Sequence, residues 1–235
     1  MDLTGKIALV TGGGRRVGRA IVGELGRAGM HVIVHCHASR AEAEAVAAGL
    51  PHATVAQADL RDRAQCRALI EGVRRDAGRL DLLVNNAAGY RRAPFADEDE
   101  SAWDDLLALN LVAPALLTRH ALPLGLSSVV NVLDVGAWQP WRHHAAYASS
   151  KAGLAQLTRN LALELAPSVR VNGVAPGTVA FPPDFTAAER AAITGRIPLG
   201  RIGDPADVAR AVRFLAGEDF LTGVILPVDG GAQLR

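Results

Sequence analysis

The stretch Thr11-Gly12-Gly13-Gly14-Arg15-Arg16-Val17-Gly18 lies between a short apolar run and a segment with helical spacing. The apolar run, residues 7–10, is typical of a buried strand, and Val17, Ile21 and Leu25 recur at steps of four, on one helical face. Glycines let the backbone turn sharply and let N–H groups at a helix N-terminus approach a pyrophosphate. A plain tight turn would also use glycines, but the order strand, turn, helix indicates a dinucleotide site.

The same alternation of strand-like and helical segments continues along the chain. Short β-branched runs recur at residues 7–10, 31–34, 82–84, 129–132, 169–171 and 224–228. Alternation of this kind predicts an α/β protein, a doubly wound parallel sheet of Rossmann type with helices on both faces. We find no linker or repeat, so residues 1–235 form one domain. The proline- and glycine-rich stretch of about 176–204 is predicted to be a long substrate loop.

Composition excludes several classes of protein. Of 235 residues, 49% are hydrophobic and 21% charged, which suits a sizeable core and excludes a disordered or fibrous chain. The 25 basic and 24 acidic residues leave a net charge of +1, so a nucleic-acid partner is not expected.

The sequence carries no signal for a membrane, a disulfide framework or a metal. The longest stretches without a charged residue, 45–58 and 120–133, are too short to span a bilayer, and the N-terminus has no apolar signal segment. Cys36 and Cys66, the only cysteines, do not make a disulfide framework or a zinc cluster. We therefore expect a cytoplasmic protein without a bound metal.

The end of the second predicted strand bears on the choice of dinucleotide. Proteins that bind NAD carry an acid about 20 residues after the glycines, where it holds the ribose 2′-OH. Residues 35–40 contain no acid and offer donors and positive charge from His37, Ser39 and Arg40. A 2′-phosphate would suit these groups, so we predict NADP(H). His35 faces the same side as His37, and only one of them has to touch the ligand.

Tyr147 and Lys151 form the second signal. Positions i and i+4 lie one above the other on a helix, and a nearby ammonium favours the phenolate, which makes the tyrosine a usable general acid. Such a pair could also be an ordinary surface pair. Its place in the chain favours catalysis, because it follows the glycine turn, residues 85–87 and Asn110 in that order.

These motifs and their order resemble the short-chain dehydrogenases/reductases, over a span from Lys6 to about Leu234. The likeness also rests on residues 58–60, 172–177 and 229–231. It implies that Lys151 holds the nicotinamide ribose, that Asn110 supports Lys151 through a water-linked proton path, and that the protein is a homotetramer. It implies that residues 58–60 contact the adenine ring. It also implies that the following residues bind the cofactor: Gly12, Arg15, Arg16, Val17, Gly18, Asp59, Leu60, Asn86, Ala87, Pro176 and Gly177.

Two departures from the family pattern narrow the resemblance. Arg16 stands where the turn usually has its middle glycine, and Asp134 stands where the catalytic serine lies, thirteen residues before Tyr147. Both resemble the pteridine reductases and the dihydromonapterin or dihydrofolate reductases, as does the aromatic Tyr90. That likeness implies that Tyr90 stacks on a pterin ring and that Arg16 reaches phosphate and pterin together. Ala88 lacks the serine hydroxyl that many pteridine reductases have there.

The chemistry of Asp134 supports the same interpretation. An ionised carboxylate has no proton to give to a ketone oxygen, but it can pair with the NH and NH2 donors of a pterin. It also tends to raise the pKa of Tyr147 and so opposes Lys151. We predict an NADPH-dependent reductase of a dihydropterin or dihydrofolate, with Tyr147 as proton donor and Asp134 orienting the substrate.

Other interpretations stay open at this point. A general carbonyl reductase is the alternative, and a non-catalytic NADP-binding sensor is a third hypothesis. Asp134 could also be a lost serine in an inactive reductase. Four further aromatic residues are candidates for the substrate cleft by location alone, with helix or loop packing as the other explanation: Trp138, Trp141, Phe181 and Phe185.

Overall fold

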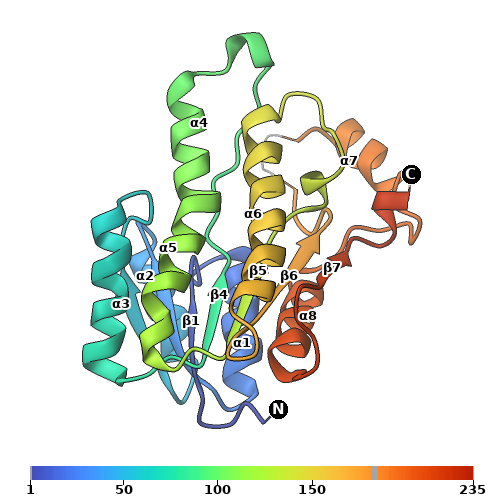
Figure 1. Cartoon of the computed structure of the whole chain (residues 1–235). Coiled ribbons are helices and arrows are strands. Elements are labelled where there is room, and N and C mark those ends of the chain that lie inside the picture. The colour runs from blue at the N-terminus through green and yellow to red at the C-terminus, as the bar shows by residue number, and fades with distance from the viewer. Residues whose placement is uncertain (1, 182–184, 235) are drawn as a thin grey trace.

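The computed structural model of the chain describes residues 2–181 and 185–234. Its described residues form one parallel sheet in the order β3-β2-β1-β4-β5-β6-β7, with helices on both faces, as Figure 1 shows. The fold class predicted from the sequence is therefore confirmed. The strands are β1 Ile7–Val10, β2 His31–Cys36, β3 Ala53–Gln57, β4 Leu82–Asn85, β5 Ser128–Val132, β6 Arg170–Pro176 and β7 Ile225–Val228.

Two cores lie on the two faces of this sheet. Successive side chains of a strand point to opposite faces, so Val10 packs with α1 and α8, whereas Leu9 packs with α3 and α5. Burying one leucine stabilises the fold by roughly 1.5–3 kcal/mol, and both faces of β1 are buried. The helices are α1 Arg16–Arg27, α2 Arg40–Ala48, α3 Arg63–Ala77, α4 Glu100–Leu107, α5 Ala113–Ala121, α6 Ala145–Glu164, α7 Ala187–Thr194 and α8 Pro205–Gly217.

The six apolar runs predicted to be strands each overlap a strand, although residues 169 and 224 lie one position before β6 and β7. The sequence analysis gave no range for β3. Residues of β3 are half-buried or exposed, because β3 is the edge of the sheet and pairs only with β2. An edge strand of this kind lacks the continuous apolar run that marks a strand buried on both faces.

The stretch of about 176–204 is not a single irregular loop, which corrects that prediction. Pro176 ends β6, and α7 follows a capping box in which Thr186 and Glu189 bond each other's backbone N–H groups. The pattern Thr-x-x-Glu is a signal for a helix start, and it outweighs the prolines around it. Pro182 and Pro183 lie outside the described residues.

Within the part of the chain that the structure describes, one continuous helical stretch, Glu100–Leu124, is long and apolar enough to cross a membrane by length and composition. Our search for charge-free stretches missed it, because it contains a few charged residues. A core helix of a globular protein passes the same test, and Leu117 and Leu124 are buried in the core beside α3. We therefore attribute its apolar side chains to the core.

The carboxyl ends of the strands form one edge of the sheet, and the strand order reverses between β1 and β4. In sheets of this type, ligands bind at that edge beside the point of reversal. The glycine turn follows β1, and residues 85–87 end or follow β4, so both signals lie there.

Candidate active site

The glycine turn is fastened to the strands on either side of it. The side-chain amide of Asn86, after β4, donates to the carbonyl oxygens of Thr11 (2.8 Å) and Gly12 (3.2 Å). Gly12 has a φ of +63°, and a Cβ added to Gly18 would lie 2.1 Å from the Gly12 oxygen. No side chain fits between the turn and the start of α1, so these glycines are required for the fold as well as for a ligand.

The start of α1 can receive an anion. Arg15, at the N-cap, makes no side-chain hydrogen bond to the first turn, and its guanidinium pairs with Glu42 of α2. The first N–H groups of a helix have no partner within the helix, which suits a phosphate. Arg16, in the place of the usual glycine, has a φ of +47°, a left-handed conformation that costs a non-glycine residue about 1–2 kcal/mol.

His35 holds the turn from the side of β2. The N–H of Gly12 donates to Nδ1 of His35 (3.1 Å), and Nε2 lies 3.1 Å from the carbonyl oxygen of Ala58. A neutral imidazole with its proton on Nε2 satisfies both contacts. Burial lowers the pKa of His35 to about 4. His35 is thus a structural residue of the turn, and His37 remains the predicted contact of the ligand.

A pocket beyond the end of β2 contains two of the three residues predicted to select the dinucleotide, His37 and Arg40, but not Ser39. It is lined by His37, Arg40, Gln57, Ala58, Asp59 and Gln65. Its basic groups already have acidic neighbours: Arg40 donates to Glu44 (2.8 Å), and His37 lies 3.7 Å from Asp59.

The other residues predicted near this pocket differ in their surroundings. Ser39 is the N-cap of α2 and makes no side-chain hydrogen bond there, whereas the side chain of Leu60 is buried in the core. The pKa of Asp59 is lowered to about 2, chiefly by its hydrogen bonds with Arg61. Asp59 is therefore a carboxylate at the pocket wall.

The predicted catalytic side chains meet at the carboxyl ends of β5 and β6. The hydroxyl of Tyr147 donates to Oδ2 of Asp134 (2.9 Å), and the N–H of Gly136 donates to Oδ1 (2.7 Å). Lys151, one helical turn after Tyr147, donates from Nζ to the carbonyl oxygen of Val132 (2.9 Å). Both oxygens of Asp134 thus accept hydrogen bonds, as a carboxylate does.

Burial dominates the protonation of these groups. It raises the pKa of Asp134 and, together with the neighbouring Asp134, raises the pKa of Tyr147 well above its ordinary value. It lowers the pKa of Lys151 to about 8, although Asp134 opposes that change. The sequence predicted that Lys151 lowers the pKa of Tyr147 and that Asp134 opposes it. In this structure the effect of burial and Asp134 is the larger one, and Tyr147 stays protonated.

Asn110 connects two segments of the site by hydrogen bonds. It lies in a π-helical turn, Ala108–Val112, between α4 and α5. Its Oδ1 accepts from the N–H of Gly89 (2.8 Å), and its Nδ2 donates to the hydroxyl of Ser150 (2.9 Å), which donates to the carbonyl oxygen of Tyr147. Asn110 therefore fixes the loop after β4 to α6. Its predicted water-linked path to Lys151 stays a prediction.

Tyr90 lies beside Tyr147, with ring centroids 5.1 Å apart in an edge-on arrangement. Its hydroxyl is 2.7 Å from Nε2 of His144, a residue that the sequence analysis missed. The available signal was its position, three residues before Tyr147 at the start of a helix. Trp141 packs edge-on against His144, so this candidate does border the site.

The other three aromatic candidates have contacts elsewhere. Trp138 donates from Nε1 to Gln233 near the C-terminus (3.1 Å). Phe181 and Phe185 pack against each other, and Arg190 and Arg92 lie over their respective rings. Loop packing accounts for these contacts.

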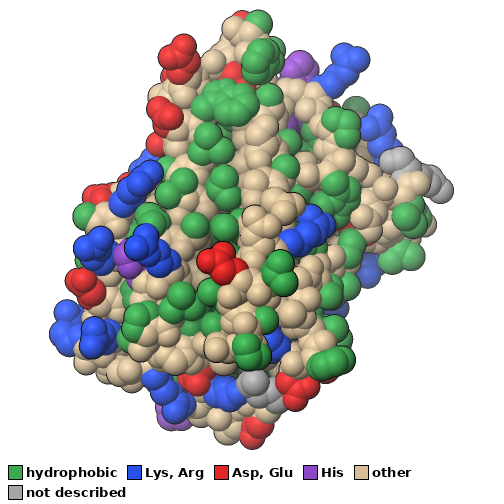
Figure 2. Space-filling model, viewed as in Figure 1, with side chains coloured by type: hydrophobic (Ala, Val, Ile, Leu, Met, Phe, Trp, Pro, Cys, Tyr) green, Lys and Arg blue, Asp and Glu red, His purple; other side chains and the backbone are tan. Residues whose placement is uncertain are grey.

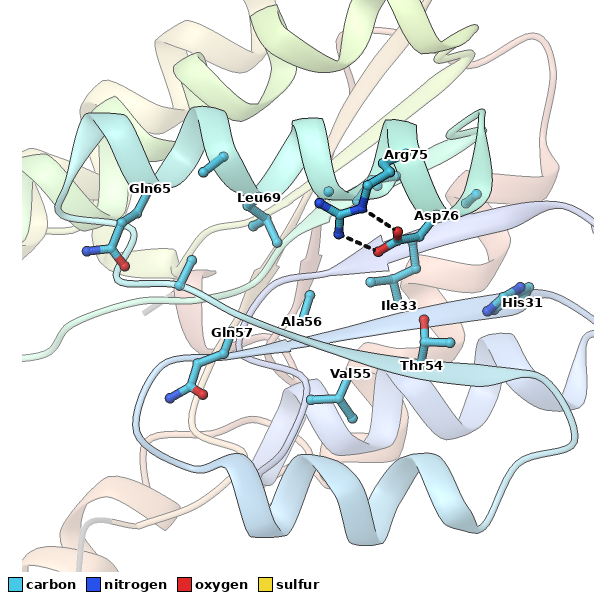
Figure 3. Close-up of a pocket in the computed structure, with 15 residues that line it drawn as sticks. His31, Ile33, Thr54, Val55, Ala56, Gln57, Gln65, Leu69, Arg75 and Asp76 are labelled. Carbon is cyan, nitrogen blue, oxygen red and sulfur yellow. Dashed lines mark hydrogen bonds and ion pairs between the residues drawn. The ribbon is translucent and has the colours of Figure 1, made fainter.

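A second pocket, of about 370 Å³, lies between β3 and α3, shares Gln57, Ala58 and Gln65 with the pocket beyond β2, and is lined by only one of the predicted site residues, Ala58. Figure 3 shows Leu69 of α3 and Val55 of β3 at its walls, with the ion pair of Arg75 and Asp76 at one side. We place the chemistry at Tyr147, because the pocket at β3 has no pair of groups suited to proton transfer. In the described residues, no group of three or more His, Cys, Asp or Glu side chains could hold a metal ion.

The fold and the site define a dinucleotide-dependent oxidoreductase: a cradle for phosphates at the strand reversal, and beside it a buried Tyr147 with Lys151 one turn away. A family model described as enoyl-(acyl carrier protein) reductase matches residues 13–233. The chain belongs to the short-chain dehydrogenase/reductase superfamily, which confirms the broader resemblance seen in the sequence.

Curated relatives match the chain over nearly its full length. A protein named as ketoacyl reductase 2 of the granaticin polyketide synthase of Streptomyces violaceoruber is 38% identical over 97% of this chain and 96% of its own. L-fucose dehydrogenase of Bos taurus is 37% identical over 98% and 90%. A 3-oxoacyl-(acyl-carrier-protein) reductase of Thermotoga maritima is 34% identical over 98% and 99%. These names favour the carbonyl reductase alternative over the predicted pterin reductase.

The first prediction concerns His35. Between pH 7 and about pH 4.5, unfolded His35 takes up a proton at its ordinary pKa, but folded His35 does so only near pH 4. Its share of the unfolding free energy should therefore fall by about 2–3 kcal/mol over this range. In urea unfolding, the free energy of unfolding should fall less between pH 7 and about pH 4.5 for His35→Gln than for the wild type. The exposed His52→Gln is the control, and an equal loss in all three proteins would contradict the assignment.

The second prediction concerns Lys151. Its ammonium form is present below its pKa of about 8 and is lost above it. We expect kcat to be constant from pH 6 to 7.5 and to fall by about tenfold per pH unit above pH 8, as for loss of one essential proton. Lys151→Arg should be slower but show no break near pH 8, because a guanidinium stays protonated. A wild-type profile that is level to pH 10 would rule out this role.

Proposed function

We propose that this protein is an NADPH-dependent reductase that acts on the C=N bond of a dihydropterin or dihydrofolate-type ring. The observation that carries the proposal is the hydrogen bond between Tyr147 and Asp134, in the position where the family resemblance leads one to expect a serine. Asp134 accepts hydrogen bonds from Gly136 and Tyr147 and can accept further ones from a substrate. A pterin ring supplies NH and NH2 donors, whereas a ketone oxygen requires donors from the enzyme.

The residues divide the chemistry as follows. NADPH, when bound, would supply the hydride for the ring carbon. Tyr147 gives its hydroxyl proton to the ring nitrogen, directly or through water. The hydrogen bond from the Tyr147 hydroxyl to the Asp134 carboxylate spans 2.9 Å and orients the hydroxyl, and the phenolate left after proton transfer regains its proton from solvent. Lys151 holds the nicotinamide ribose, and its positive charge stabilises the phenolate while it exists.

The cofactor is proposed to lie along the strand reversal. The glycine turn and Arg16 take the phosphates, residues 58–60 take the adenine ring, and residues 86–87 and 176–177 border the nicotinamide. NADPH is preferred because the pocket beyond β2 offers the basic groups of His37 and Arg40. The 2′-phosphate replaces Glu44 as the partner of Arg40.

A second candidate, a carbonyl reductase, is supported by the names of the relatives, two of which are ketoacyl reductases. It requires Asp134 to donate a hydrogen bond to the carbonyl oxygen in place of the serine. Because burial raises the pKa of Asp134, a protonated Asp134 could do so at low pH. An NADPH oxidation assay on dihydropterins, dihydrofolate and oxoacyl or other ketones separates the candidates. Ketone turnover without pterin turnover would overturn our proposal, and tight NADPH binding without any turnover would support the sensor hypothesis.

Replacing Asp134 tests the role of its carboxylate. Asp134→Ser should lower kcat/KM for a dihydropterin by about 10–100-fold, since the substrate loses a charged hydrogen-bond acceptor worth about 1.5–3 kcal/mol. It should also raise turnover of ketones, because a hydroxyl can donate to a carbonyl oxygen. Asp134→Ala, which has neither a hydrogen-bond acceptor nor a donor in its side chain, is the control and should lose pterin activity without gaining ketone activity. Unchanged pterin reduction in Asp134→Ser would show that Asp134 does not orient the substrate.

The pocket beyond β2 has its own test. The double variant His37→Ala, Arg40→Ala should weaken NADPH binding by about 10-fold or more and leave NADH binding nearly unchanged, because only NADPH has the 2′-phosphate. Cofactor fluorescence titration measures both dissociation constants. Arg75→Ala removes an exposed arginine of α3 that does not line the pocket beyond β2, and it is the matched control. Equal weakening of both cofactors would place the 2′-phosphate elsewhere.

We also propose a homotetramer in the cytoplasm. The family resemblance suggests the assembly, and several apolar side chains are exposed: Leu163 on α6, Phe214 on α8, and Phe220 just after it. Figure 2 shows hydrophobic side chains over the α4–α6 side of the molecule, where a second copy could cover them. Two buried free thiols, Cys36 and Cys66, suit a reducing compartment.

A further inference from the structure

The contact between Tyr90 and His144 joins two walls of the proposed substrate site. Tyr90 lies in the loop after β4, and His144 is the N-cap of α6, three residues before Tyr147. Their polar atoms, the Tyr90 hydroxyl oxygen and Nε2 of His144, are 2.7 Å apart. His144 is only 9% exposed, whereas Tyr90 is 49% exposed. One partner is therefore held inside the protein while the other can meet a ligand.

The proton positions in this contact follow from the surroundings of Nδ1, the other ring nitrogen of His144. Nδ1 of His144 lies 2.7 Å from the carbonyl oxygen of Arg142, which can only accept, so Nδ1 carries a proton. Burial lowers the pKa of His144, so the ring is neutral near pH 7. In a neutral ring with its proton on Nδ1, Nε2 is an acceptor. The hydroxyl of Tyr90 must then be the donor in the bond to His144.

Ring contacts fix Tyr90 as well. Its ring lies edge-on to Tyr147 at 5.1 Å and tilted to His144 at 5.3 Å. Trp141 packs edge-on against His144 at 5.7 Å and supports it from behind. Edge-on aromatic pairs at such distances are favourable. The hydrogen bond and the rings together define the orientation of Tyr90 beside the proton donor.

We propose that His144 is a positioning residue for the substrate: its Nε2 accepts the hydrogen bond of the Tyr90 hydroxyl, so that Tyr90 offers the substrate a fixed ring and an oxygen that only accepts hydrogen bonds. The inference rests on the proposed function of the same site and refines its substrate class. Asp134 and Tyr90 both present acceptors, so the substrate carries hydrogen-bond donors along the edge that faces them. A ring with NH and NH2 groups meets this requirement, and a simple ketone does not.

The arrangement depends on pH in a defined direction. A protonated His144 would donate from Nε2 to Tyr90, and the hydroxyl proton of Tyr90 would then turn towards the substrate. Of the charged groups near His144, Arg92 and His143 favour its neutral form, whereas Asp134 favours its protonated form. The carbonyl of Arg142 also favours protonation, and Tyr147 lies 6.4 Å away, ring centre to ring centre. Acidification therefore converts Tyr90 from an acceptor to a donor.

The first test needs no substrate. Nitrogen-15 NMR of labelled histidine should show His144 neutral at pH 7 with its proton on Nδ1. Tyr90→Phe should raise the pKa of His144, because it removes a hydrogen bond that only the neutral ring accepts. Phe95→Leu, an exposed change on another segment, is the control and should leave the pKa of His144 unchanged. A proton on Nε2, or no change in Tyr90→Phe, would overturn the proposal.

The second test measures substrate binding. Tyr90→Phe and His144→Phe should each raise KM for a dihydropterin by about three- to tenfold, as for the loss of one hydrogen bond, with kcat and the KM for NADPH within about twofold. The double variant should resemble either single variant, because both remove the same bond. His144→Gln, whose side-chain oxygen can accept from Tyr90, should restore part of the loss and serves if His144→Phe does not fold. Additive effects, or an equal effect on NADPH, would contradict a positioning role.

The two tests also separate this inference from the proposed function. If the enzyme reduces ketones and not pterins while the NMR result holds, the proposed function is wrong but the hydrogen-bond assignment stands. The positioning role for a substrate with hydrogen-bond donors then fails as well, because a ketone offers no donor to Tyr90. If pterins are reduced but Tyr90→Phe has no effect on KM, the function stands and the positioning role is wrong.

Discussion

The close approach of α1 to the end of β1 is the constraint on which the rest of the site depends. A Cβ on Gly18 would lie 2.1 Å from the Gly12 oxygen, so only glycine at position 18 lets α1 begin this close to the turn after β1. His35 and Asn86 then bind the turn to the ends of the adjacent strands. The N-terminus of α1 therefore points at the strand reversal, the edge at which ligands bind in sheets of this type.

The relatives share the fold around the glycine turn, and a few side chains at the strand ends determine the chemistry. The relatives that align over nearly the whole chain are named for different substrates, including ketoacyl groups and L-fucose. Function at this level is decided by the site and not by the fold. In this chain the residue that distinguishes the site is Asp134, a buried carboxylate next to the proton donor. Burying a carboxylate is costly, and its two hydrogen bonds with Gly136 and Tyr147 offset part of that cost.

The sequence was informative wherever one local rule determines the structure. Five of the predicted strands lie inside the sheet, and the edge strand β7 was predicted because its residues, Ile-Leu-Pro-Val, are all apolar. The glycine turn, residues 85–87 and Asp134 lie at or just after the predicted strand ends. The edge strand β3 was not found, because an exposed strand lacks an apolar run. The helix α7 was hidden among prolines, although its capping box is present in the sequence.

The parts of the site that the sequence missed depend on contacts between distant segments. His144 and Tyr90 are 54 residues apart, and no spacing rule predicts that they meet. The protonation of Tyr147 was also difficult to predict, because Lys151 and Asp134 act in opposite directions and the depth of burial decides between them. Local patterns give the elements and the motif residues, whereas proton positions require the three-dimensional surroundings.

The positions of the hydroxyl protons indicate which class of substrate the site can bind. In the resting site the protons of Tyr90 and Tyr147 point at His144 and Asp134, so the cleft between them presents lone pairs. A ketone brings only acceptors to such a surface and has to wait for Tyr147 to turn away from Asp134. A ring bearing NH groups can bind to Asp134 and Tyr90 first and leave the hydroxyl of Tyr147 free to donate. A substrate that binds in this way replaces the hydrogen bond lost by Asp134 with one of its own, so no buried polar group is left without a partner at the moment of proton transfer.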